Sequence, residues 1–212
     1  MFPLHEQPLM PGKRTTTLNR IEIADAAIRI IGDCGISSLT TTTLAKELGV
    51  SSGAPFRHFA SREEILCAVG ERVLELMGKT FPDEALPPLE RLSQLFVARI
   101  QAVTRHGGVA RLIFSDQFSK ALPEAAAALI HTFVLHTRKF VLDAITQGAA
   151  SGDIRKDVPA EHLLVLFVGT MQHAAFLSAM NRDQRPPLPM DPQIIFQSIR
   201  TLIGSQAQVT TK

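Results

Sequence analysis

The chain has 212 residues, of which 45% are hydrophobic, enough to bury a core within one or two small domains. Its formal charge is only +2, and basic and acidic residues are equally frequent over residues 1–80. The total charge therefore gives only weak support for binding nucleic acid. Two cysteines, Cys34 and Cys67, are too few for a disulfide framework, so we expect reduced core residues in a cytoplasmic protein.

Helix-forming patterns dominate from the start, and no stretch alternates convincingly between apolar and polar residues, so the expected class is all-α. Residues 1–16 contain Pro, His and Glu where a signal peptide needs an unbroken apolar run, and we expect a disordered arm. Residues 18–33 are expected to form the first helix, with an apolar stripe of Ile21, Ala24, Ile28 and Ile31.

The segment 40–59, TTTTLAKELGVSSGAPFRHF, has the start and stop signals of a helix-turn-helix. Thr40 can cap a short helix whose Leu44, Ala45 and Leu48 share one face, and Gly49 can end it in the left-handed conformation. Ser51 or Ser52 is then expected to cap a second short helix. Such a helix has small polar residues at its N-terminus, which suits an approach to base edges in the major groove of DNA.

A further helix is expected over residues 62–79, because Ser61 and Glu64 have the spacing of a capping box. The pairs Phe81-Pro82 and Pro87-Pro88 then interrupt the chain, and we place a domain boundary there. Apolar periodicity predicts helices over residues 89–103, 109–114 and 123–148.

Residues 163–180 form an uncharged run that is apolar almost all round. Its length fits a transmembrane span, but the central Gln172 and His173 favour a helix covered on one side by its own domain and on the other by a partner. A last helix over 191–204 would complete that partner surface.

Several pieces of this pattern together resemble the TetR family of bacterial transcription regulators. They are Leu44-Ala45, Gly49-Val50-Ser51, Gly53, the run Phe56 to Phe59, and Ser61 with Glu64-Ile65-Leu66. The resemblance implies an all-α fold of about nine helices, in which an N-terminal three-helix helix-turn-helix DNA-binding domain (17–79) precedes a larger ligand-binding and dimerisation domain (86–206).

The resemblance also implies which residues contact a double-stranded operator. Thr40 and Thr42 would bind phosphate at a helix N-terminus, and His58 and Arg62 would bind phosphate after the recognition helix. The groove-facing end would comprise Ser51, Ser52, Gly53, Ala54 and Pro55. Two recognition helices about 34–36 Å apart would then bind a near-palindromic site.

Two departures from the family pattern affect these contacts. Phe56 stands where the family often has Tyr, so a phosphate-directed hydroxyl is missing, although Phe56 stays among the candidate DNA contacts. No Lys or Arg lies between Ser51 and Pro55, and specificity is therefore expected to draw on Lys13 and Arg14 in a minor groove or on DNA shape.

The resemblance further implies that helices at about 160–181 and 191–204 form a four-helix bundle in a homodimer. It also implies that the C-terminal part binds a small-molecule effector that releases the protein from DNA, and we expect this effector to be apolar or amphipathic. The candidate pocket residues are aromatic side chains and the polar groups among them: Phe96, Phe114, Phe118, Phe133, His136, Phe167, Gln172 and His173. Activation of transcription and a metal-responsive sensor built from separate helices remain alternatives. No cofactor or metal motif is present, and the absence of a phosphate-binding Gly-rich loop, Gly-x-Ser-x-Gly and His-Glu-x-x-His argues against an enzyme.

Overall fold

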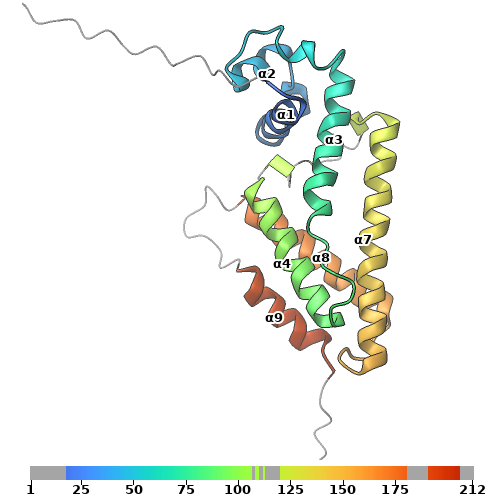
Figure 1. Cartoon of the computed structure of the whole chain (residues 1–212). Helices are drawn as coiled ribbons and strands as arrows, with labels where there is room; N and C mark the ends of the chain where they lie inside the picture. Colours follow the sequence, from blue (N-terminus) through green and yellow to red (C-terminus); the bar gives the residue numbers. More distant parts are fainter. Residues whose placement is uncertain (1–17, 107, 110–111, 113–119, 181–190, 206–212) are drawn as a thin grey trace, which may run out of the picture.

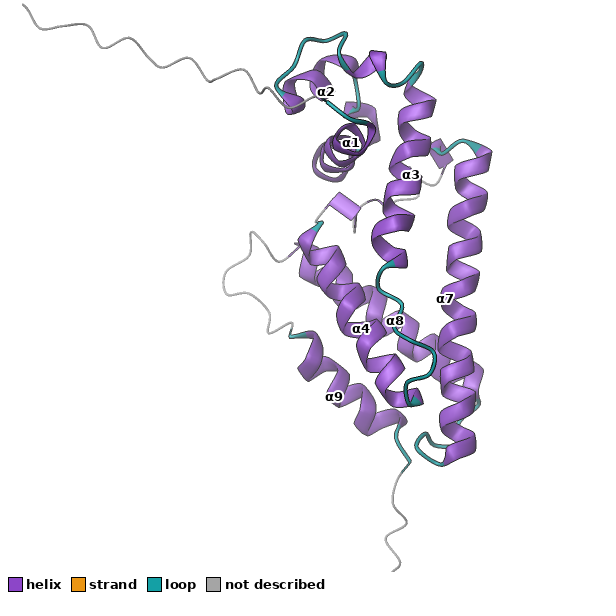
Figure 2. Cartoon of the chain, viewed as in Figure 1, coloured by secondary structure: helices purple, strands orange, loops and turns teal. Residues whose placement is uncertain are grey.

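A computed structural model describes the chain except for residues 1–17, 107, 110–111, 113–119, 181–190 and 206–212. Its described residues contain seven α-helices, two 3₁₀ turns and a single isolated β-bridge, in agreement with the all-α prediction. Helices α1 (Arg20–Cys34) and α2 (Thr41–Leu48) form one end of the molecule (Figures 1 and 2). The other end is formed by α4 (Pro88–Arg105), α7 (Glu124–Ser151), α8 (Ala160–Met180) and α9 (Pro192–Ile203), and α3 (Arg62–Gly78) runs from the first group to the second.

Helix α1 (Arg20–Cys34) begins at Asn19, whose side chain accepts a hydrogen bond from the backbone N–H of Glu22 while the Glu22 carboxylate accepts from the N–H of Asn19. It ends at Gly35, which has a φ of 82°. The predicted apolar stripe is wrong at Ile21, which is 53% exposed, whereas Ile23 is fully buried. Cys34 is also exposed rather than in the core, because it lies in the last turn, where α1 leaves the core.

Helix α2 (Thr41–Leu48) follows the prediction closely. Thr40 is its N-cap, and the Thr40 and Thr43 side chains each accept from the backbone N–H of the other, as in a capping box. Gly49 ends the helix with φ 67°, ψ 34°, the left-handed conformation that favours glycine. Leu44, Ala45 and Leu48 are buried against the rest of the N-terminal group, which fixes the orientation of α2.

Helix α3 (Arg62–Gly78) begins at Ser61, whose hydroxyl accepts from the N–H of Glu64. The predicted reciprocal bond is absent, because the Glu64 carboxylate accepts from the N–H of Ala60 instead of Ser61. Helix α3 packs against α1 on one side and against α7 (Glu124–Ser151) on the other. The second contact is close at Gly70, where a Cβ would lie in ordinary van der Waals contact, 3.5 Å from the Cβ of Ala126. The two ends of the molecule therefore share α3.

The C-terminal core is built by α4 (Pro88–Arg105), α7, α8 (Ala160–Met180) and α9 (Pro192–Ile203), with α4 in contact with the other three. Phe96 of α4 lies edge-on to Phe167 of α8, with ring centroids 5.9 Å apart, and 6.0 Å from Phe196 of α9. The bridge between Ile154 and Gly204 closes the far end, where the N–H of Arg155 donates to the carbonyl of Ile203. Of the helix predicted over 109–114, most residues lie outside the described ones.

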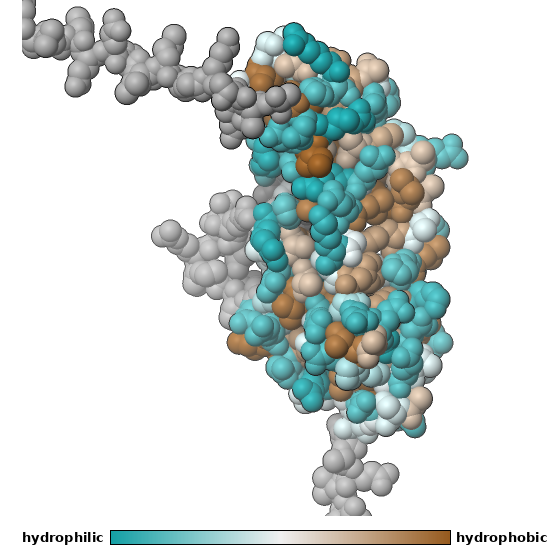
Figure 3. Space-filling model, in the orientation of Figure 1, coloured by the Kyte–Doolittle hydropathy of each residue, from teal (hydrophilic) through white to brown (hydrophobic). Residues whose placement is uncertain are grey.

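Large apolar side chains remain exposed on two faces. Val165 and Leu166 of α8 are 64% and 61% exposed, and Ile194 and Leu202 of α9 are 67% and 68% exposed. A second group lies on α7 and comprises Leu129, Val134 and Leu135. Figure 3 shows apolar residues interrupting the hydrophilic surface of the face it presents. Helix α8 is also the one described helix that is long and apolar enough to cross a membrane.

Candidate nucleic-acid interface

The segment after Gly49 is shorter and tighter than the predicted second helix. It consists of a turn in which the N–H of Ala54 donates to the carbonyl of Ser51, followed by a 3₁₀ turn, η2 (Pro55–Arg57). Neither Ser51 nor Ser52 caps it, since its N-cap position is Ala54 and no side chain caps it. Pro55 has no N–H to donate to the carbonyl four residues earlier, and Gly53 favours helix weakly, so an α-helix is not sustained here.

Exposure divides the residues expected to face the groove. Ser51, Ser52 and Gly53 are exposed, and Ala54 is half-buried. Pro55 is buried, so its expected groove contact is corrected to a packing role inside the turn. Phe56 is half-buried against the core, consistent with the missing phosphate-directed hydroxyl. The surface offered to a groove is therefore the Ser51-Ser52-Gly53 turn.

The N-terminus of α2, at the opposite end of that helix from the turn, presents a second polar surface. Thr40 and Thr42 are both exposed, but the Thr40 hydroxyl is engaged with the N–H and hydroxyl of Thr43. Thr42 is in the first turn, where backbone N–H groups lack partners inside the helix and the helix dipole favours an anion. Thr42 and the adjacent N–H groups can therefore hold a phosphate.

Arg62, expected to bind phosphate, also makes structural hydrogen bonds. Its Nε donates to the carbonyl of Leu39 at 3.2 Å, and its Nη2 donates to the carbonyl of Ile36 at 2.8 Å. These bonds join the start of α3 to the short turn η1 (Ile36–Ser38) that leads into α2. These bonds give Arg62 a positioning role, which sequence spacing alone could not reveal, and the phosphate contact of this exposed side chain stays a prediction.

Arg20 organises the other side of the unit, and the sequence did not indicate this. Its guanidinium lies 4.0 Å from the centroid of the Phe59 ring, donates to the carbonyl of His58, and pairs with the Glu64 carboxylate at 2.9 Å. Glu64 also accepts from the N–H of Ala60, and this bond, together with Arg20, lowers the pKa of the Glu64 carboxyl. His58 itself is half-buried, and Arg20 of α1 joins the carbonyl of this residue, just after η2, to Glu64 of α3.

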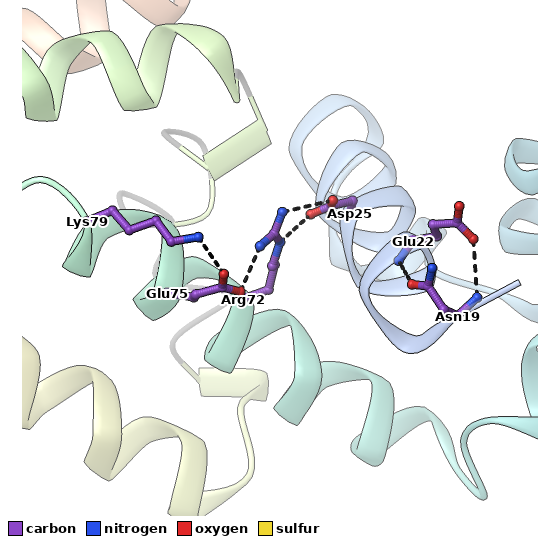
Figure 4. Close-up of polar contacts among 6 residues, drawn as sticks. All are labelled: Asn19, Glu22, Asp25, Arg72, Glu75 and Lys79. Atoms are coloured by element: carbon purple, nitrogen blue, oxygen red, sulfur yellow. Dashed lines mark hydrogen bonds and ion pairs between the residues drawn. The ribbon is translucent and has the colours of Figure 1, made fainter.

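A network of side chains further along fixes α1 to α3 (Figure 4). Arg72 binds Asp25 through two parallel hydrogen bonds, Nε–Oδ1 at 2.8 Å and Nη2–Oδ2 at 3.2 Å. Its Nη1 donates to Glu75 at 2.7 Å, and Lys79 binds the same carboxylate. Asp25 and Glu75 together raise the pKa of Arg72, whose side chain is only 16% exposed.

Lys13 and Arg14, the proposed minor-groove contacts, lie outside the described residues. Lys46 and Arg57 are exposed basic residues close to the candidate interface in the chain. These two side chains can therefore supply positive charge near the candidate interface although the total charge of the chain is close to neutral.

The candidate pocket residues that the structure describes in the C-terminal part fall into separate groups. Phe96 and Phe167 are fully buried against each other in the core. Gln172 and His173 are exposed on α8, on the side that also exposes Val165 and Leu166, so they are corrected from pocket to surface residues. Phe133 and His136 do come together, both against Phe81, and Phe114 and Phe118 lie outside the described residues.

One groove of about 400 Å³ lies between α4 and α9. It is open, and none of the candidate pocket residues lines it; its lining is Ser93, Gln94, Val97, Ala98, Gln101, Gln193 and Gln197. Within the described ranges, no group of three His, Cys, Asp or Glu side chains could hold a metal ion.

Comparison with known proteins agrees with this architecture. Residues 23–69 match the family model of bacterial regulatory proteins, tetR family. The HTH-type transcriptional repressor KstR2 of Mycolicibacterium smegmatis is 28% identical over 160 residues, which are 74% of this chain and 75% of that protein.

Two solved structures share the fold. The ketosteroid transcriptional regulator KstR2 of Mycobacterium tuberculosis superposes with a TM-score of 0.72 at 23% identity, covering 91% of this chain and 98% of that one. AibR in complex with isovaleryl coenzyme A and operator DNA superposes with a TM-score of 0.69 at 19% identity, covering 87% and 98%.

Proposed function

Because this chain belongs to the TetR family of bacterial regulatory proteins, we propose that it is a transcriptional repressor that binds a near-palindromic operator as a homodimer. An apolar or amphipathic small molecule releases it from that operator. The observation that carries the proposal is the exposed polar surface formed by the N-terminus of α2 and the Ser51-Ser52-Gly53 turn, held on a rigid support by Arg20 and Arg62.

The two parts of the chain have different proposed functions. Residues 17–79 bind DNA, and residues 86–206 bind the effector and form the dimer. Helix α3 couples the two, since it begins directly after η2 and packs against α7 over the other end of the molecule. A change in the C-terminal part can therefore reach the DNA-binding unit through a helix that both parts share.

In the proposed complex, the Ser51-Ser52-Gly53 turn enters the major groove. Serine hydroxyls donate or accept with any base edge, and Gly53 lets the backbone approach closely. Thr42 and the first N–H groups of α2 hold an adjacent phosphate. Phosphate contacts set the register, so base specificity rests on few side chains and on DNA shape.

The proposed dimer forms through α8 and α9. Both helices expose large apolar residues in the single chain, and the exposed group on α8 also contains Gly169, which permits close approach of a partner helix. A four-helix bundle from two such pairs would bury this surface and would hold two DNA-binding units at a fixed spacing. The same burial accounts for the apolar α8 in a cytoplasmic protein.

The proposed effector site lies in the C-terminal part. KstR2 of M. smegmatis is named as a repressor, and AibR has been solved with both isovaleryl coenzyme A and operator DNA. These proteins support a repressor that responds to a small molecule. They do not specify the effector of this chain, for which the described residues offer separate evidence below.

The test uses a substitution that separates folding from DNA binding. Thr42→Asp places a negative charge in the first turn of α2, where it stabilises the helix by about 0.3–1 kcal/mol, but repels a phosphate at the same place. We expect unchanged or higher thermal stability and operator binding weakened at least tenfold in a gel-shift assay on sites selected from random DNA.

Thr146→Asp is the matched control, because Thr146 is an exposed residue in the second half of α7, far from α2 along the molecule (Figure 1). It adds the same charge and should leave DNA binding unchanged. Equal DNA binding by Thr42→Asp and Thr146→Asp would remove the N-terminus of α2 from the interface.

A further inference from the structure

Arg99 is a buried cation for which the described part of the chain supplies no anion. It lies on the inner face of α4 and is 8% exposed. Its Nε and Nη2 atoms are buried and have no hydrogen-bond partner among the described residues. Buried polar groups are almost always hydrogen-bonded, and a buried charge is normally paired, so this arginine requires a specific explanation.

Aromatic rings surround the guanidinium but only partly compensate its charge. Its Cζ lies 5.2 Å from the ring centroid of Phe81 and 5.0 Å from that of Phe133. Phe81 in turn contacts His136, with centroids 4.7 Å apart, and Phe140 at 5.3 Å. Cation–π contacts supply electrostatic attraction, but they accept no N–H hydrogen bond in the plane of the guanidinium.

The charge persists despite burial. Removal from water lowers the pKa of Arg99 to about 10, so the side chain stays protonated at neutral pH. Arg91 lies two turns earlier on the same helix and is also buried, and its Nε likewise has no partner among the residues that the structure describes. It differs from Arg99 at Nη2, which donates to Oε1 of Gln147 at 2.6 Å. The fold thus gives a polar partner to one buried arginine and leaves the hydrogen-bonding edge of the other unused.

We infer that Arg99 is the anchor for the carboxylate of an amphipathic effector whose apolar body lies against Phe81, Phe133 and His136. Nε and Nη2 lie on the same edge of the guanidinium, and that edge binds two carboxylate oxygens through parallel hydrogen bonds. A monoanion matches the single buried positive charge, whereas a phosphate dianion would leave an excess charge in an apolar site. This inference rests on the proposed function and specifies its effector class.

The position of the site gives the effector a route to the DNA-binding unit. Phe81 follows α3 by three residues, in the connector that runs to Pro88 at the start of α4 (Figure 1). A carboxylate at Arg99 competes with Phe81 and Phe133 for the space around the guanidinium. Displacement of Phe81 would move the C-terminal end of α3, the helix that carries Arg62 and Arg72.

The test compares two carboxylates with their neutral amides. Decanoate, decanamide, 4-phenylbutanoate and 4-phenylbutanamide are titrated into the full-length protein by calorimetry and thermal shift. At least one carboxylate is expected to bind saturably and at least tenfold more tightly than its amide. Arg99→Met should abolish this preference, because it removes a charge-assisted pair of hydrogen bonds worth roughly a factor of ten to a hundred in affinity.

Arg91→Met is the matched control and also guards against loss of folding. It removes a buried arginine that has a partner, so it should lower the unfolding temperature but keep the carboxylate preference. Arg99→Met without ligand should unfold at the same or a higher temperature than the wild type, because replacing an unpaired buried charge by an apolar side chain is neutral or stabilising.

Three results would overturn the inference: no wild-type preference for either carboxylate, a preference that survives Arg99→Met, or an unliganded Arg99→Met as destabilised as Arg91→Met. A parallel gel shift separates this inference from the proposed function. Carboxylate preference without binding to any selected DNA would refute the regulator and keep the anion site, whereas DNA binding without carboxylate preference would refute the anion site alone.

Discussion

A backbone contact between α1 and the chain just beyond α4 yields the sharpest prediction about stability. Gly32 lies on the buried side of α1, and a Cβ built on it would be 2.2 Å from the Cα of Gly108 and 3.0 Å from its carbonyl oxygen. The reciprocal contact is equally tight, since a Cβ on Gly108 would lie 2.4 Å from the carbonyl oxygen of Ile28. The two backbones therefore touch only because both residues lack side chains.

Gly32→Ala must displace one of these backbones. Forcing a methyl group into a packed site costs about 1–3 kcal/mol, and the better helix propensity of alanine returns up to about 1 kcal/mol. The expected net loss is about 1–2 kcal/mol in the free energy of unfolding, or about 2–8 °C in the unfolding temperature of a chain of this size. Urea denaturation followed by circular dichroism measures this loss.

Gly78→Ala is the control for this experiment. Gly78 is also helical, at the last position of α3, but a Cβ there would meet nothing within 4 Å. It gains propensity without a clash and should leave stability unchanged or slightly raised. If Gly32→Ala is as stable as Gly78→Ala, the close contact between α1 and Gly108 does not exist and the reasoning fails.

Three further substitutions test other contacts. Glu64→Gln removes a carboxyl group whose pKa in the folded protein is lowered from 4.5 by the Ala60 N–H and by Arg20. The ionised carboxylate therefore stabilises the fold above pH 4.5, and this stabilisation is lost as the pH falls through the folded pKa. Urea midpoints of wild type and variant should therefore differ at pH 7 and pH 5, and the difference should shrink as the pH is lowered further below 4.5; a constant difference would contradict this. Arg72→Met leaves Asp25 unpaired and half-buried and should lower the free energy of unfolding by about 1–2 kcal/mol. Lys79→Met, which breaks only an exposed ion pair, should lower it by less than about 0.5 kcal/mol. Equal losses would show that burial of the Arg72–Asp25 pair is unimportant. Leu166→Glu should convert the dimer to monomers in light scattering after gel filtration while Leu129→Glu on α7 does not, and the reverse order would place the interface on α7.

Local chemistry allowed much of the fold to be predicted from the sequence. The cap at Thr40, the left-handed Gly49 and the helix beginning after Ser61 each depend on residues within four positions of one another. The long helices followed from apolar periodicity, and their ends differ from expectation by only a few residues. The weak second helix was overestimated, because Pro55 and Gly53 decide its conformation more strongly than a serine cap does.

Contacts between distant residues were not predictable in this way. The partners of Arg20 and Arg62, and the partner Asp25 of Arg72, lie 23 to 47 residues away in the chain, and no local pattern links them. Gln172 and His173 were misplaced for another reason: α8 is apolar almost all round, so its period could not distinguish the side that faces the core from the exposed side.

The central claim is that two copies of the Ser51-Ser52-Gly53 turn bind DNA together. The most direct measurement is a gel shift with footprinting of the purified dimer on the DNA upstream of its own gene and its divergent neighbour, at two salt concentrations. The account predicts a protected inverted repeat whose half-sites are about one helical turn apart, with weaker binding at higher salt. A folded dimer that gives no shift at low salt, on this DNA or on sites selected from random DNA, would contradict it.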